Sequence, residues 1–71
     1  MVINECDTVK TLVDKTFENG FVPAGTVADV MLIVEKKDKT LGFILEINSI
    51  NEENPLFGFD ENEIELVKHF S

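Results

Sequence analysis

The sequence predicts an all-β domain, because apolar residues alternate with a period of two and turn residues interrupt the chain at short intervals. The 71 residues have room for one domain, residues 1–71. Apolar residues make up 44% of the chain, which is enough for a compact core. Five short strands at such spacings are typical of a small barrel or sandwich.

The first strand is predicted over residues 8–14, which are rich in β-branched side chains. Residues 15–25 are predicted to form a long loop. They hold two groups of turn residues, Asn19-Gly20 and Pro23-Ala24-Gly25.

The second strand is predicted over residues 26–35. Val27 is out of phase with the alternating residues Val30, Leu32 and Val34. A β-bulge near Ala28 and Asp29 would let Val27 and Val30 both point inward, and would bend the strand as a small barrel requires.

Residues 36–39 form a charged hairpin turn in this interpretation, and the clearest strand follows it. Its inward face is predicted to carry Leu41, Phe43, Leu45 and Ile47. Phe43, in the middle of this face, is expected in the core.

The last third of the chain is predicted as a polar loop over 48–55, a short strand over 56–59, and a turn or single 3₁₀ turn over 60–62. A final strand then starts at Ile64 and ends near Phe70. A helix over residues 60–70 is the alternative, because three side chains would share one helical face: Ile64, Val67 and Lys68.

Two segments carry a resemblance to a known family. Residues 22–30 contain Pro23, Gly25, Val27 and Val30, and this Pro-x-Gly-x-Val-x-x-Val pattern resembles the core of KOW-type and related SH3-like barrels. Residues 59–67 resemble their closing turn and last strand. The resemblance implies a small five-stranded SH3-like barrel, as in a family of short bacterial domains of unknown function.

The charge balance argues against the RNA contacts common among KOW-type barrels. Fourteen acids stand against six basic residues, all of them lysine, and the net charge is −8. Such a surface repels phosphate backbones, so nucleic-acid binding is not expected. It suits a basic protein partner, because opposite fields speed encounter. The alternative is that the charge only keeps a small protein soluble.

Half of the acidity lies between residues 46 and 65, a segment that contains no lysine. We predict that this segment docks a cationic partner, with a solvated face as the alternative. The predicted acidic contacts are Glu46, Glu52, Glu53, Asp60, Glu61, Glu63 and Glu65. Ile50, Leu56 and Phe57 would be the apolar anchors of the interface, or would plug the end of the barrel.

No catalytic or metal-binding pattern is present in the sequence. Cys6 and His69 are the single cysteine and histidine, so neither a disulfide nor a zinc-ligand spacing arises. Cys6 is expected to be a small, buried or half-buried apolar residue. We therefore expect no enzyme activity, no cofactor and no metal.

Two functions remain. The first is an immunity protein or antitoxin-like inhibitor that neutralises a basic toxin, such as a nuclease, by occupying its cationic cleft. The second is a non-catalytic accessory module that docks on a larger enzyme or assembly. We predict a cytoplasmic protein, because the sequence has one cysteine, no recognisable signal peptide and no apolar run long enough to span a membrane. The oligomeric state stays open.

Overall fold

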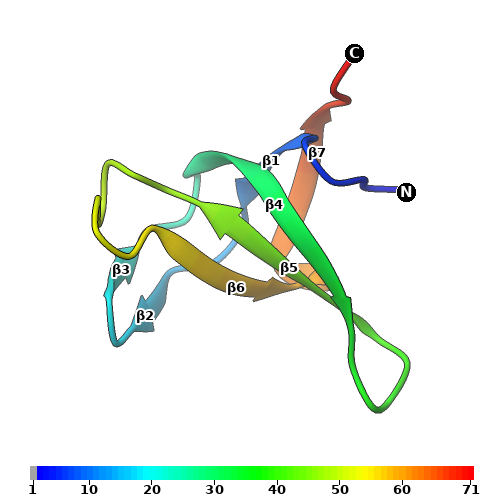
Figure 1. Cartoon of the computed structure of the whole chain (residues 1–71), viewed down its shortest axis with the longest axis horizontal. Coiled ribbons are helices and arrows are strands. Elements are labelled where there is room, and N and C mark those ends of the chain that lie inside the picture. The colour runs from blue at the N-terminus through cyan, green and yellow to red at the C-terminus, as the bar shows by residue number, and fades with distance from the viewer. Residues whose placement is uncertain (1) are drawn as a thin grey trace.

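The computed structural model describes residues 2–71, and β-strands make up almost all of its regular structure (Figure 1). The elements are β1 (Thr8–Thr11), β2 (Lys15–Phe17), β3 (Gly20–Val22), β4 (Val27–Glu35), β5 (Leu41–Glu46), β6 (Leu56–Asp60), the 3₁₀ turn η1 (Glu61–Glu63) and β7 (Ile64–Lys68). The all-β prediction is confirmed.

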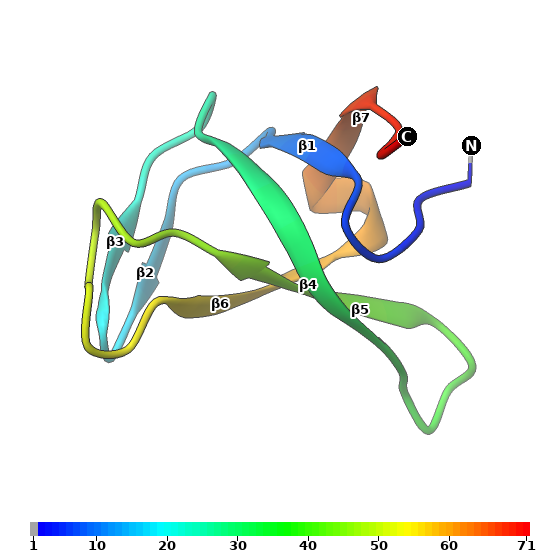
Figure 2. The ribbon, with the colours of Figure 1, turned by 45° about the horizontal axis from the view of Figure 1, so that its top comes forward.

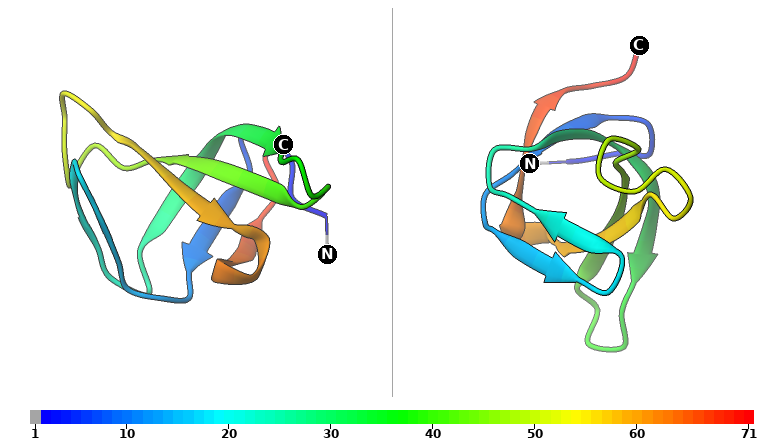
Figure 3. Two further views of the ribbon diagram at one scale, coloured as in Figure 1. Left: turned by 90° about the horizontal axis from the view of Figure 1, so that it is seen from below. Right: turned by 90° about the vertical axis from the view of Figure 1, so that its left-hand side faces the viewer.

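Five strands form one antiparallel sheet in the order β6-β5-β4-β1-β7, and β2 and β3 form a separate hairpin. The main sheet curls around the core (Figure 3), but its order ends at β6 on one side and β7 on the other, so it is open. Residues 64–68 pair with β1, so the helical alternative for residues 60–70 is wrong. The 3₁₀ turn is confirmed as η1.

The predicted loop over residues 15–25 is wrong in part, because it contains the β2–β3 hairpin. Lys15 pairs with Val22, and Phe17 pairs with Gly20. Each strand has three residues, which is too short for alternation to be visible in the sequence. Gly20 adopts a φ of +152° at the turn, a conformation that glycine tolerates.

β4 contains a bulge, but not at Ala28 and Asp29. Its register shifts between Val30 and Leu32, so the face that points inward changes there. Ala28 and Val30 are buried, whereas Val27 is 57% exposed. Beyond the bulge the residues predicted to point inward, Leu32 and Val34, point outward instead.

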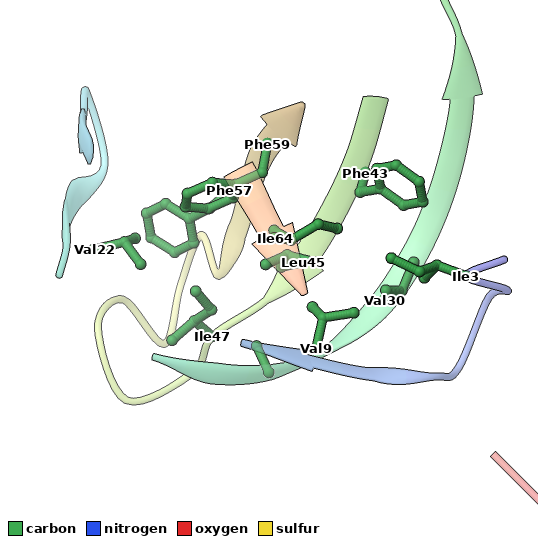
Figure 4. Packing of buried hydrophobic residues seen from close by; sticks show 11 residues of the cluster. Ile3, Val9, Val22, Val30, Phe43, Leu45, Ile47, Phe57, Phe59 and Ile64 are labelled. Carbon is green, nitrogen blue, oxygen red and sulfur yellow. The ribbon is translucent and has the colours of Figure 1, made fainter. Parts of the chain in front are cut away.

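The core confirms the predicted alternation of the strand after the charged turn. Phe43, Leu45 and Ile47 are buried (Figure 4), and the partly buried Leu41 packs against the core cluster. Phe57 and Phe59 of β6 lie in the same core and meet Phe17 of β2 edge-on. The ring centroid of Phe17 lies 5.1 Å from that of Phe57 and 5.4 Å from that of Phe59.

A buried carboxylate joins the two ends of the chain. Asp7 accepts hydrogen bonds from the backbone N–H groups of Asn4 and Phe70, both at 2.8 Å, and its Oδ2 lies 2.8 Å from Nδ1 of His69. The N–H donors of Asn4 and Phe70, followed by His69, hold the pKa of Asp7 below its usual value. Cys6, beside it, is exposed, so the prediction that it is buried or half-buried is wrong.

Candidate protein interface

The structure divides the acidic segment between the two ends of β6. Glu52 and Glu53 lie in the loop before this strand, whereas Asp60, Glu61 and Glu63 lie at its far end and in η1. Four residue steps along a strand separate the ends of β6 by about 13 Å. Glu46 ends β5 and Glu65 lies in β7. The predicted acidic residues therefore do not form one patch.

Lysines from distant parts of the chain accompany the acids around η1. Lys36 pairs with Asp60, and Lys15 Nζ lies 2.9 Å from Glu63 Oε1. A looser contact of 3.9 Å joins Lys10 and Glu65. The sequence segment lacks lysine, but the folded surface at this end does not.

The contacts of Asp60 and Glu63 lower the pKa values of these two carboxylates. The backbone N–H of Asp60 donates to Glu63 at 2.7 Å, and this bond, followed by the one from Lys15, lowers the pKa of Glu63 below its usual 4.5. The hydrogen bond from Lys36 lowers the pKa of Asp60, and the same bond raises the pKa of Lys36.

A different set of carboxylates gathers at the other end of the molecule. The β2–β3 turn lies against the loop over residues 48–55 (Figure 2), and both carry exposed acids. We call this surface the acidic end and define it by Glu18, Glu52 and Glu53. Among residues 2–71 none of its carboxylates takes part in the ion pairs, which involve Asp7, Asp60, Glu63 and Glu65.

Asparagine side chains bind the two loops of the acidic end together. Asn19 Nδ2 donates to the carbonyl groups of Asn54 at 2.8 Å and Leu56 at 3.0 Å. Asn51 Nδ2 donates to the carbonyl of Asn19 at 2.9 Å. Asn51 Oδ1 also accepts from two N–H groups of its own loop, those of Glu53 and Asn54. Loops tied in this way present their charges in a defined arrangement.

The three predicted apolar anchors have different positions. Phe57 is 1% exposed and belongs to the core, so it is not available to a partner. Ile50 is partly buried against the core, and its Cγ2 lies 2.6 Å from the position that a Cβ on Gly20 would take. Leu56 is exposed and lines an open groove with Glu18, Asn19 and Asn54.

Sequence reasoning missed Glu18, Asn19 and the exposed Phe21 of β3. Glu18 lies 34 positions before Glu52 in the sequence, and only the pairing of β2 with β3 brings the turn between them to the second loop. The Asn19-Gly20 dipeptide was the available signal, since it is typical of a tight hairpin.

No metal site accompanies these surfaces in the part of the chain that the structure describes, because no three His, Cys, Asp or Glu side chains are grouped closely enough there to hold an ion. Within residues 2–71 no helix has the length and apolar character needed to cross a bilayer. Comparison with protein-family models, curated proteins and solved structures finds no match to the chain.

Proposed function

We propose that this chain is a non-catalytic protein-binding module whose acidic end docks on a basic protein. Its role is that of an immunity protein or antitoxin-like inhibitor, which covers the cationic cleft of a toxin. We assign the fold to the SH3-like barrels, an assignment supported by the strand order β6-β5-β4-β1-β7 and by the 3₁₀ turn before the last strand. The proposal rests on the difference between the two ends of β6. The carboxylates of the acidic end have no ion-pair partner among residues 2–71, whereas Asp60 and Glu63 at the far end pair with lysines.

The acidic end offers three carboxylates that no lysine of residues 2–71 pairs with, on two loops held together by Asn19 and Asn51. A partner can satisfy these carboxylates without first breaking an internal ion pair. The three lysines of the β4–β5 turn lie at the opposite side of the molecule (Figure 1). Carboxylates lie beside those lysines, among them Asp38, Asp60 and Glu61, so a basic partner is attracted more strongly to the acidic end than to that side.

Exposed apolar side chains lie beside this charge. Leu56 lines the groove at the acidic end, and Phe21 lies next to Gly20 in β3. Charges accelerate encounter, while apolar side chains that become fully buried slow dissociation. A nuclease toxin suits this surface, because its own substrate requires a cationic cleft.

An accessory module of a larger assembly is the second candidate, supported by the exposed apolar side chains Leu32 and Val34 on β4. The two functions differ in what the partner does alone. An inhibitor's partner harms the cell or cleaves its substrate until this chain is added, whereas an assembly partner loses activity without it.

A matched pair of charge reversals tests the proposed surface. Glu52→Lys/Glu53→Lys changes the acidic end, and Glu35→Lys/Glu61→Lys changes exposed carboxylates elsewhere, with the same change of four in net charge. The wild type and both double variants are used as bait in the native cell. The protein that the bait retains is purified, and its affinity for the wild type and for each double variant is measured.

We expect the first double variant to weaken binding at least tenfold more than the second. Raising ionic strength from about 0.05 to 0.5 M shortens the Debye length from roughly 14 to 4 Å, so the on-rate should fall steeply. Equal losses from both double variants would contradict a local interface. A partner with no activity to inhibit would exclude the inhibitor role.

A further inference from the structure

The β2–β3 turn contains the one Asn-Gly dipeptide of the sequence, Asn19-Gly20. The side-chain amide of an asparagine is open to attack by the backbone nitrogen of the next residue. A glycine favours this attack, because it has no Cβ to obstruct it and its backbone adopts conformations that other residues avoid. The other asparagines are followed by glutamate, serine or proline. The side-chain amide most prone to deamidation therefore lies in this turn.

The fold depends on both residues of this labile pair. Asn19 Nδ2 donates to the carbonyl groups of Asn54 at 2.8 Å and Leu56 at 3.0 Å, and so joins the two loops of the acidic end. Gly20 has a φ of +152°, and a Cβ at this position would lie 2.6 Å from Cγ2 of Ile50. The contact between the loops therefore requires the dipeptide whose chemistry is least stable.

The same contacts oppose the reaction in the folded chain. The Asn19 amide has two N–H donors, and its Nδ2 is bonded to two carbonyl groups of the second loop. The backbone carbonyl of Asn19 accepts a further bond from Asn51 Nδ2 at 2.9 Å. The Asn19 side chain must leave these partners before its Cγ can reach the backbone nitrogen of Gly20. The reaction therefore starts from a locally opened state, and its rate follows the population of that state.

The reaction needs only water as co-reactant. The backbone nitrogen of Gly20 forms a bond to Cγ of Asn19 and loses its proton, while the bond between Cγ and Nδ2 breaks and Nδ2 leaves as ammonia. Water then adds to one of the two carbonyl groups of the cyclic imide that results, and the ring opens to aspartate or isoaspartate. Nothing is oxidised or reduced in either step.

Either product is incompatible with the contact between the loops. A carboxylate has no N–H group, so its oxygens would face the carbonyl oxygens of Asn54 and Leu56, and the new charge would lie next to Glu18. These carbonyl groups would lose their donor. Isoaspartate also adds a methylene group to the main chain of the turn, between the paired residues Phe17 and Gly20.

From this geometry we propose that Asn19 is a deamidation site, that the contacts between the two loops of the acidic end protect it, and that its modification separates those loops. Folding delays the reaction, and the reaction, once complete, removes the contact that delayed it. The acidic end thus contains an irreversible local switch. This inference does not depend on the proposed function, because the reaction needs no partner.

Peptide mapping by mass spectrometry measures the loss of each side-chain amide during incubation in a mildly alkaline buffer. The folded chain is compared with the chain unfolded in guanidinium chloride. Asn19 should react at least about tenfold more slowly in the folded chain. Asn48 is the internal reference, because it is exposed and takes no part in the hydrogen bonds that join the loops. Folding should slow the reaction of Asn48 much less.

Asn51→Ala tests whether the contacts between the loops are the source of the protection. It removes the bond to the backbone carbonyl of Asn19, so Asn19 of the folded variant should react at least about threefold faster than in the folded wild type. The matched control Asn62→Ala replaces an asparagine of η1, at the far end of β6, and should leave the rate at Asn19 unchanged. Circular dichroism melts verify that both variants are folded during the incubation.

Asn19→Asp reproduces the aspartate product and tests its effect on the loops. It should lower the melting temperature by at least about 5 °C and accelerate backbone amide exchange in the loop over residues 48–55. Asn48→Asp adds the same charge to that loop without changing a contact between the loops. It should lower the melting temperature by less than about 2 °C.

Three results would overturn the proposal. The first is an Asn19 that stays intact in the unfolded chain, or that reacts as fast in the folded chain as in the unfolded one. The second is an Asn51→Ala variant with the same rate at Asn19 as Asn62→Ala. The third is an Asn19→Asp variant that melts together with Asn48→Asp. None of these measurements includes a partner, so their failure is distinct from a failure of the proposed function.

Discussion

The two ends of β6 carry similar carboxylates in different surroundings. Around η1, Asp60 and Glu63 accept hydrogen bonds from Lys36 and Lys15, and their pKa values are lowered. At the acidic end Glu52 and Glu53 have no such partner among the ion pairs within residues 2–71. The first group contributes to stability, and the second is free to contribute to recognition.

This difference shows that a run of acids in a sequence is a poor guide to an interface. The hairpin β2–β3 brings Lys15 to Glu63, and the β4–β5 turn brings Lys36 to Asp60. Both lysines are far from their partners in the sequence. Clustering in the chain and clustering on the surface are separate properties, and only the second matters to a partner.

The largest expected effect is on the free energy of unfolding, and it tests whether Phe57, beneath the acidic end, is a core residue while its neighbour Leu56 is not. Phe57→Ala should lower the free energy of unfolding by about 3–5 kcal/mol, because Phe57 is buried and meets Phe17 edge-on. Its exposed neighbour Leu56 is the control, and Leu56→Ala should cost less than about 1 kcal/mol. Urea denaturation measures both. Similar costs would mean that Phe57 is not the core residue of this pair.

The next effect tests the contact that joins the two loops of the acidic end. Gly20→Ala should destabilise by about 1–3 kcal/mol, because its Cβ would lie 2.6 Å from Cγ2 of Ile50 and its φ is +152°. In Gly20→Ala/Ile50→Ala the clash is removed and only the backbone strain remains. The double variant should therefore be more stable than the sum of the two single changes predicts. Strict additivity in thermal melts would show that the two residues are not in contact.

A smaller effect distinguishes the paired carboxylates by their pH dependence. Glu63→Gln should lower stability at pH 7 by about 1 kcal/mol, because it weakens the bonds from Asp60 and Lys15. The pKa of Glu63 is lowered in the folded state, so the stabilisation is present above its usual 4.5 and is lost as the pH falls through the lowered value. The difference in melting temperature from wild type should therefore shrink as the pH falls below 4.5 and through the lowered pKa of Glu63. A difference that is constant with pH would show that the charge of Glu63 is not responsible.

The smallest effect is expected at the acidic end. Glu52→Gln/Glu53→Gln should change the free energy of unfolding by less than about 0.5 kcal/mol, while it weakens binding of a basic partner. If this variant is as destabilised as Glu63→Gln, the two ends of β6 do not differ in the way described above.

Local patterns predicted much of the strand framework. Alternation from Leu41 to Ile47 placed Phe43 and Leu45 in the core, and both are buried. The turn over residues 36–39 and the 3₁₀ turn before β7 are also where the sequence indicated. These features depend on neighbouring residues, so a short stretch of sequence contains the information that they need.

The sequence by itself determined an all-β chain with strongly acidic surfaces, because composition and period-two alternation are properties of the chain. Tertiary structure decided where those surfaces lie. The bulge between Val30 and Leu32 depends on pairing with β5, and it exposes Leu32 and Val34. The acidic end depends on Asn19 reaching Asn54 and Leu56. Contacts between residues far apart in the chain leave no local pattern, so the positions of both candidate interfaces emerge only when the strands pair.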